Sequence, residues 1–191
     1  MGERQTTAPG IEPVTLTEMK AHLRVDIDDE DDLITSLIVT ARSAIEHRTR
    51  RQMITAVWDL SLPGFPSCGR IELPFSNLQS VMSIAYADIN GDTQTLDTAY
   101  YRVLTDSDPG FVQRAPSVSW PTVEYGNAAP VTVRYTAGYG DTADDVPEGV
   151  RHAIKLLVGH YYWHRESVGE SSLNRVPDTI ENLIAQYRII A

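Results

Sequence analysis

Residues 28–51 read DDEDDLITSLIVTARSAIEHRTRR, and they predict a long helix near the start of the chain. The acidic residues 28–32 supply an N-cap and negative charge in the first turn, whereas Arg48, Arg50 and Arg51 place positive charge in the last turn. Both ends therefore complement the helix dipole. At about 1.5 Å per residue the helix is roughly 30–35 Å long. Its apolar side chains recur at the 3.6-residue spacing of an amphipathic helix, at Leu33, Leu37, Ile38, Ala41, Ala44 and Ile45.

Three further helices are predicted, one before this stretch and two at the other end of the chain. Thr15 and Glu18 match a capping box that opens a short helix ending near Arg24. Pro147, with acidic residues on both sides of it, opens a helix that frays near residue 165. A last helix starts at residues 176–178, and its apolar stripe consists of Ile180, Leu183, Ile184 and Tyr187.

Between the helical ends, the apolar period changes from 3.6 to 2. Apolar and polar side chains alternate through residues 54–62, which is typical of a half-buried strand. Asn90 and Gly91 form a strong hairpin-turn signal. Short strands are predicted at residues 54–62, 70–73, 81–87, 93–96, 100–104, 118–120 and 131–137, and together they suggest a small sandwich or barrel-like sheet.

These patterns predict an α+β fold. The N- and C-terminal helices form a small helical bundle, and an antiparallel β-rich subdomain is inserted between them. The expected boundaries are a flexible N-terminus at residues 1–12, N-terminal helices at 13–52, the β-rich insertion at 53–140, and C-terminal helices with an apolar tail at 141–191.

Composition excludes several classes of protein. The 191-residue chain has 16 basic and 26 acidic side chains and a formal net charge of −10, which argues against tight binding to nucleic acid. The single cysteine, Cys68, excludes an intrachain disulfide framework. The chain starts without an apolar signal segment, and no uncharged apolar run reaches the roughly 18 residues that span a bilayer. We therefore expect no membrane partner.

No set of residues predicts catalysis. His160 and His164 lie four residues apart on one helix face, a spacing that can hold zinc, and His152 lies two turns earlier. The glutamate of a zinc-protease motif is absent, and a third ligand is not secured. The acidic run at 28–32 lacks the glycine and the spaced glutamate of an EF-hand, and no Gly-x-Ser-x-Gly elbow occurs. We therefore predict that the protein is not an enzyme and has no catalytic, cofactor-binding or metal-binding residue.

Four stretches resemble the head–tail connector (adaptor) proteins of tailed bacteriophages and gene transfer agents, in the long form with a β insertion. They are residues 14–26 (VTLTEMKAHLRVD), the acidic start at 29–33 running into 41–51, residues 133–140 (VRYTAGYG) followed by Val146-Pro147 and Ala153-Ile154, and residues 183–188 (LIAQYR). Their combination in this order spans nearly the whole chain.

The resemblance implies a structural protein of the virion neck, at the head–tail interface, assembled in the host cytoplasm. Such adaptors form a ring of about 12 copies, joined by head-to-tail contacts that close by rotation. The ring lies beneath the portal, contacts a stopper or tail-completion protein, and extends the channel through which DNA passes without specific binding. An acidic channel wall would let DNA slide during packaging and ejection.

The resemblance also implies contact surfaces. The helical ends form the ring, and the C-terminal segment docks onto the portal. The expected portal-binding residues are Ile180, Leu183, Ile184, Tyr187, Arg188, Ile189 and Ile190. The expected inter-subunit residues on the helices are Leu33, Leu37, Arg42, Arg48, His160 and His164.

Three alternatives stay open. The first is another head-completion (stopper) or tail-completion protein, although these usually read as mostly β. The second is a metal-dependent or hydrolytic enzyme, which tight retention of zinc would support. The third is a nucleic-acid-binding regulator, which would have to bind duplex DNA at physiological salt.

Overall fold

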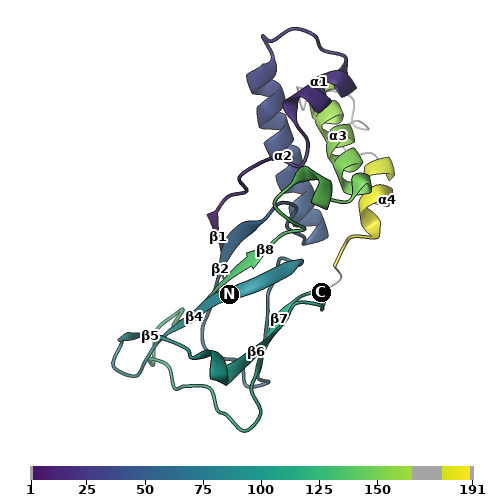
Figure 1. The fold of residues 1–191 in the computed structure, drawn as a ribbon. Helices are drawn as coiled ribbons and strands as arrows, with labels where there is room; N and C mark the ends of the chain where they lie inside the picture. The colour runs from purple at the N-terminus through teal and green to yellow at the C-terminus, as the bar shows by residue number, and fades with distance from the viewer. Residues whose placement is uncertain (1, 165–177, 190–191) are drawn as a thin grey trace. The chain divides into compact units, whose positions relative to one another are not determined.

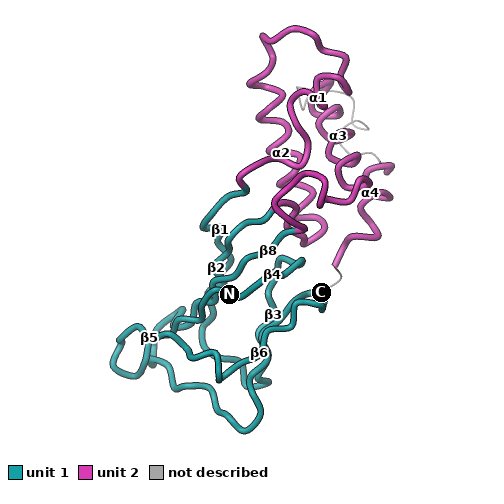
Figure 2. The backbone as a smooth tube through the Cα atoms, in the orientation of Figure 1, with its two compact units in different colours: residues 1–9, 55–138, 191 teal, residues 10–54, 139–190 magenta. Residues whose placement is uncertain are grey.

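The structure, a computed structural model, describes residues 2–164 and 178–189 and divides the chain into two compact units (Figures 1 and 2). The helical unit comprises residues 10–54 and 139–190, and the β unit comprises residues 1–9 and 55–138. Each unit has its own hydrophobic core. Helices and antiparallel sheets occur together, so the predicted α+β class is confirmed.

The helical unit begins with two helices whose ends follow from local sequence. In α1 (Leu16–Leu23), the Glu18 N–H donates to Thr15 Oγ1 at 3.2 Å and the Thr15 N–H donates to Glu18 Oε2 at 2.9 Å, so the predicted capping box is present. Glu30 is the N-cap of α2 (Asp31–Thr49). This helix ends before Arg50, which adopts the left-handed conformation with φ of 58°. Arg50 and Arg51 therefore lie beyond the last turn, in which we had expected them.

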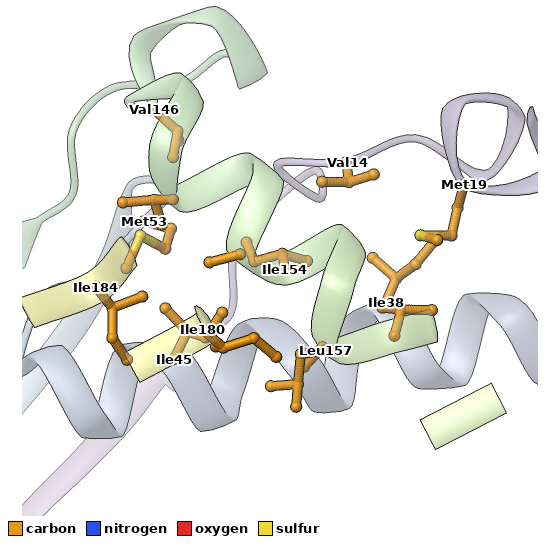
Figure 3. Packing of buried hydrophobic residues seen from close by; sticks show 14 of the residues in the cluster. Val14, Met19, Ile38, Ile45, Met53, Val146, Ile154, Leu157, Ile180 and Ile184 are labelled. Carbon is orange, nitrogen blue, oxygen red and sulfur yellow. The ribbon is translucent and has the colours of Figure 1, made fainter. Parts of the chain in front are cut away.

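Two further helices, α3 (Glu148–Trp163) and α4 (Asp178–Ala185), complete the core of the helical unit. Figure 3 shows that α2, α3 and α4 all contribute to one apolar cluster. The buried stripe of α2 is rotated slightly from the predicted one, since Ile34 is fully buried whereas Leu33 and Leu37 are half-buried at its margin. Among the labelled side chains of the cluster are Ile45, Ile154, Leu157, Ile180 and Ile184.

An ion pair is buried in this unit on the C-terminal half of α2. Arg42 and Glu46, only 7% and 4% exposed, lie one turn apart, and Arg42 Nη1 donates to Glu46 Oε2 at 2.7 Å. Arg42 Nε also donates to Glu12 Oε2 at 2.7 Å. The other Glu46 oxygen, Oε1, accepts from Gln52 Nε2 at 2.7 Å and from the Met53 N–H at 3.0 Å. Burial raises the pKa of the Glu46 carboxyl, and the Arg42 charge opposes that shift.

The β unit consists of two antiparallel sheets. The five-stranded sheet has the order β1-β2-β8-β4-β5, and the three-stranded sheet has the order β3-β7-β6. Two short 3-10 helices, Thr98–Tyr100 in this unit and Ala143–Asp145 in the helical unit, lie outside the sheets. The strands are β1 (Gly2–Thr7), β2 (Ala56–Leu62), β3 (Arg70–Glu72), β4 (Leu78–Ala87), β5 (Thr93–Thr95), β6 (Tyr101–Leu104), β7 (Phe111–Arg114) and β8 (Val131–Ala137).

The core of the β unit follows from the predicted alternation. Every second side chain of β2 is buried, and β8 shows the same pattern. Trp58 of β2 lies opposite Tyr135 of β8 in the antiparallel register, and it stacks on Phe75 with the ring centroids 4.0 Å apart. Trp58, Phe75 and Tyr135 are thus packing residues of this core.

The structure corrects the expectation of a flexible N-terminus for residues 2–7. These residues form the edge strand β1, which pairs with β2 from Gly2 opposite Ser61 to Thr7 opposite Val57. Their side chains are polar and nearly all exposed, so main-chain hydrogen bonding holds the strand and no apolar pattern predicts it.

The structure also corrects the strand predicted at residues 118–120, which form a loop. Trp120 stacks on Phe65, with centroids 4.8 Å apart, and its Nε1 donates to the Pro66 carbonyl at 3.2 Å. The Val118 carbonyl accepts from the Arg114 side chain at 2.7 Å, so tertiary contacts replace strand pairing. Strand β7, just before this loop, had no counterpart among the predicted strands.

We predict that replacing Glu46 by alanine destabilises the protein strongly. The change leaves Arg42 buried with Glu12 as its remaining carboxylate and leaves the Met53 N–H without its acceptor. We expect the free energy of unfolding to fall by about 3–5 kcal/mol, measured by urea denaturation followed by circular dichroism. The control Glu181→Ala removes a half-exposed partner of Arg48 and should cost less than about 1 kcal/mol. Equal losses in the two variants would contradict the role given to the buried pair.

Candidate functional site

The expected site residues lie on the helical unit, in one group on and after α4 and another on α2 and α3. Among residues 2–164 and 178–189, no group of three His, Cys, Asp or Glu side chains could hold a metal ion. In the same ranges, no helix is long and apolar enough to cross a membrane. The candidate site is the part of the helical unit on which the expected contact residues lie.

The stripe of α4, expected to bind the portal, packs largely within its own unit. Ile180 and Ile184 are fully buried in the helical core, and Leu183 and Tyr187 pack against that core as half-buried residues. A side-chain carbon added at Gly149 of α3 would lie 3.3 Å from the Tyr187 hydroxyl, so α3 and the Tyr187 ring approach closely. Ile180 and Ile184 therefore hold α4 to its own unit, and their part in portal binding stays a prediction.

The segment after α4 is bound to the C-terminal end of α2. The Ile189 N–H donates to the Thr49 carbonyl at 3.0 Å, and Arg188 Nε donates to the Arg48 carbonyl at 3.2 Å. Arg51 Nε donates in turn to the Tyr187 carbonyl at 2.6 Å. The last carbonyls of α2, which have no partner within the helix, are satisfied in this way. Ile190 lies outside the described residues.

Ion pairs reinforce this contact at the surface. The Glu181 carboxylate accepts from Arg48 Nη1 at 3.1 Å and from Arg188 Nη2 at 2.8 Å. Arg48, expected at a contact between subunits, therefore pairs with α4 of its own chain. Arg188 keeps an exposed side chain beside this pair.

The remaining inter-subunit residues expected on α2 are buried to different degrees. Arg42 is buried in the ion pair described above, so it does not lie on a surface that another subunit can reach. This burial conflicts with the expectation that Arg42 lies at a contact between subunits. Leu33 and Leu37 are half-buried and pack against the core of their own unit.

Among the described residues of the helical unit, Trp163 at the C-terminal end of α3 has the most exposed large apolar side chain. Trp163 is 71% exposed, and it lines a groove of about 290 Å³ together with His160 and His164. The other lining residues are Leu156, Gly159, Thr179 and Ile180, so the groove is mainly apolar. Sequence reasoning missed Trp163, although its position outside the buried stripe of α3 is the signal that could have identified it.

The two histidines of this groove form a pair. Their ring centroids lie 4.7 Å apart, and His164 Nδ1 lies 2.9 Å from the His160 carbonyl. Burial, and then the nearby His164, lower the pKa of the His160 imidazole. His152 lies beside His22 of α1 instead, with ring centroids 6.4 Å apart. The third histidine therefore does not join the first two, and the groove offers apolar contact and imidazole hydrogen bonding.

We predict that stability falls when the pH drops below the ordinary imidazole pKa of about 6.5. The folded-state pKa of His160 is lowered, as is that of His22 through burial, so below pH of about 6.5 the unfolded chain binds more protons than the folded chain. The stability that depends on neutral His160 and His22 is fully present above that pH. It is lost as the pH falls toward their folded-state pKa values. Urea midpoints measured between pH of about 5 and 8 should show this slope, reduced in His160→Asn. An unchanged slope in that variant would contradict the assignment.

The sequence profile of the phage gp6-like head-tail connector protein family matches residues 13–109, just over half of the chain. Comparison with curated proteins gives no significant match.

Several solved structures share the fold over the whole chain. A chain from the neck of an empty GTA particle computed with C6 symmetry is 23% identical, with a TM-score of 0.84. A chain from the virion of a native gene transfer agent (GTA) particle is 24% identical with the same TM-score of 0.84, and one from the neck of a native GTA particle computed with C12 symmetry is 22% identical with a TM-score of 0.76. Each comparison covers 100% of this chain and 97% of the other.

Proposed function

The chain belongs to the phage gp6-like head-tail connector family, and from this premise we propose that it forms a closed ring of about 12 copies beneath the portal of a virion. Its role is structural, as a connector between head and tail. In this proposal the ring extends the DNA channel and is completed on its far side by a stopper or tail-completion protein. The family match is the observation that carries the proposal, and no catalytic step is part of it.

The similar folds support a ring in the neck. Two of the similar chains come from necks computed with C6 and C12 symmetry. A ring of identical subunits uses two different surfaces of each subunit, so that every contact is repeated around the axis. We assign the neck of the virion as the place of action on this basis.

Trp163 supports a specific contact within the ring. Exposed tryptophans beside apolar hollows are frequent centres of binding energy in protein interfaces. Trp163 stands at the rim of the groove at the end of α3, with His160 and His164 beside it. We assign this groove to the contact with the neighbouring copy, and Trp163 replaces Arg42 in the predicted inter-subunit set.

In this proposal the portal contacts the side chains of α4 and of the segment after it that stay exposed or half-buried. Because Ile180 and Ile184 are buried, the remaining candidates are the exposed Arg188 and the half-buried Leu183, Tyr187 and Ile189. With this smaller set, α4 stays packed on its own unit, and the outer side of α4 contacts the portal.

The charge of the chain supports passage of DNA without binding. A net charge of −10 repels phosphates, and tight binding requires many basic contacts to the DNA backbone. DNA is therefore proposed to move through the ring without specific recognition.

We predict that Trp163→Ala abolishes ring formation without unfolding the protein, because the indole is mostly exposed. The unchanged protein, mixed with the portal protein of the same genome, should add a ring to one end of the portal in negative-stain images. The variant should leave portals bare at an unchanged urea midpoint. The control Ile27→Ala removes another exposed apolar side chain of the helical unit and should still form rings.

Two outcomes would count against this account. Normal rings with Trp163→Ala would show that the groove is not the contact between copies. A well-assembled portal that recruits none of the unchanged protein would contradict the adaptor role and favour a stopper or tail-completion protein.

A further inference from the structure

The β unit contains a hollow whose lining carries two guanidinium groups and no carboxylate. The hollow has a volume of about 600 Å³. It is lined by Arg102 of β6, Gln113 and Arg114 of β7, and residues 115–119 of the loop that follows. In a chain in which acidic side chains outnumber basic ones by 26 to 16, such a lining is unusual in its charge.

Arg114 is held in place at the edge of this hollow. Its Nη1 donates to the Val118 carbonyl at 2.7 Å, and its main-chain N–H donates to the Gly69 carbonyl at 2.7 Å. Gln113 Nε2 donates to the same carbonyl at 3.1 Å. Gly69 has φ of 75°, and a Cβ there would lie 3.2 Å from Arg114 Nε, so the absence of a side chain at this position leaves room for the guanidinium. The group is thus positioned before any ligand binds.

Arg102 adds a second positive charge. It lies opposite Gln113 in the register of β6 and β7, and its side chain is exposed. Within residues 2–164 and 178–189, no ion pair joins a carboxylate to Arg102 or Arg114. Arg134 of the same unit differs, because its Nε and Nη2 both donate to the Asp59 carboxylate at 2.8 Å.

The donors around the hollow suit an anionic oxygen group. Guanidinium groups bind carboxylates and phosphates through charge-assisted hydrogen bonds, often two at a time. The hydroxyls of Ser117 and Ser119, which also line the hollow, can donate further hydrogen bonds. The hollow therefore has the chemistry of a receptor for an acidic group.

We propose that this hollow binds an Asp- or Glu-bearing segment of the protein that adjoins the β unit in the particle. The inference rests on the proposed function, because that function places a further neck or tail protein next to the connector. A protein carboxylate is favoured over DNA, because two guanidiniums neutralise too few phosphates to overcome the repulsion from a chain of net charge −10.

The test uses the full-length protein and a blocked tetrapeptide of alternating aspartate and glutamate as the probe. Arginine side-chain Nε–H resonances are followed by NMR at low ionic strength during titration with the peptide. The Arg102 and Arg114 signals should shift and saturate, whereas the same peptide with asparagine and glutamine should leave them unchanged. Arg102→Gln should weaken binding by about tenfold, the effect of losing one charge-assisted hydrogen bond.

Arg4→Gln is the matched control, since it removes an exposed arginine of the same unit that does not line the hollow. It should bind the acidic peptide as the unchanged protein does. Equal weakening by Arg4→Gln, binding of the neutral peptide, or no shift at millimolar acidic peptide would overturn the proposal. Tighter binding of inorganic phosphate or of a short DNA duplex at Arg102 and Arg114 would also overturn it, in favour of a phosphate site.

The result is independent of ring formation. Arg102→Gln should still build rings on the portal, and Trp163→Ala should still bind the acidic peptide. A failure of the ring assay with normal peptide binding therefore counts against the proposed function alone, and the reverse pattern counts against this inference alone.

Discussion

The buried ion pair between Arg42 and Glu46 is the constraint on which the helical unit depends. It joins α2 to Glu12 on one side and to Gln52 and Met53 on the other, so three parts of the chain meet at one pair of charges. Removing two charges from water costs several kcal/mol per ion, and the attraction between them offsets this only with good geometry and further hydrogen bonds. Both carboxylate oxygens of Glu46 are used here. The pair thereby fixes the path of the chain as it leaves α2, and a residue that looks like a surface arginine serves the interior.

Residues 178–189 complete the same unit. The carbonyls of Arg48 and Thr49 accept hydrogen bonds from Arg188 and Ile189, while the apolar stripe of α4 fills the core. This arrangement accounts for the apolar stripe of α4 by packing within its own unit. It also limits where partners can bind, because contact must use what remains exposed. On the helical unit the proposed contact surfaces are the end of α3 with Trp163 and the outer side of α4 with Arg188, and on the β unit the proposed surface is the hollow with Arg102 and Arg114.

Much of the architecture could be predicted from sequence because its signals are local. The capping box at Thr15, the apolar period of α2 and the alternation in β2 each require only neighbouring residues. The errors arose where distant contacts decide the outcome. Strand β1 has no apolar side chain and forms through main-chain pairing, and Val118 is held in a loop by Arg114 and the nearby packing of Trp120. The periodicity of the last helix marks Ile184 as apolar-facing but does not say which surface covers it, and no pattern indicates the burial of Arg42. The guanidiniums of the hollow come together only through the pairing of β6 with β7.

The central claim is that the helical unit enters the ring with α4 still packed on the core of its own chain. A cryo-electron microscopy map of the ring assembled on its portal tests this most directly, since it shows the position of α4 in every copy. The account predicts that Ile180 and Ile184 remain packed against α2 and α3 of the same chain, with Trp163 buried against a neighbouring copy. A map in which α4 has left its own unit and inserted into the portal, with Trp163 facing solvent, would contradict it.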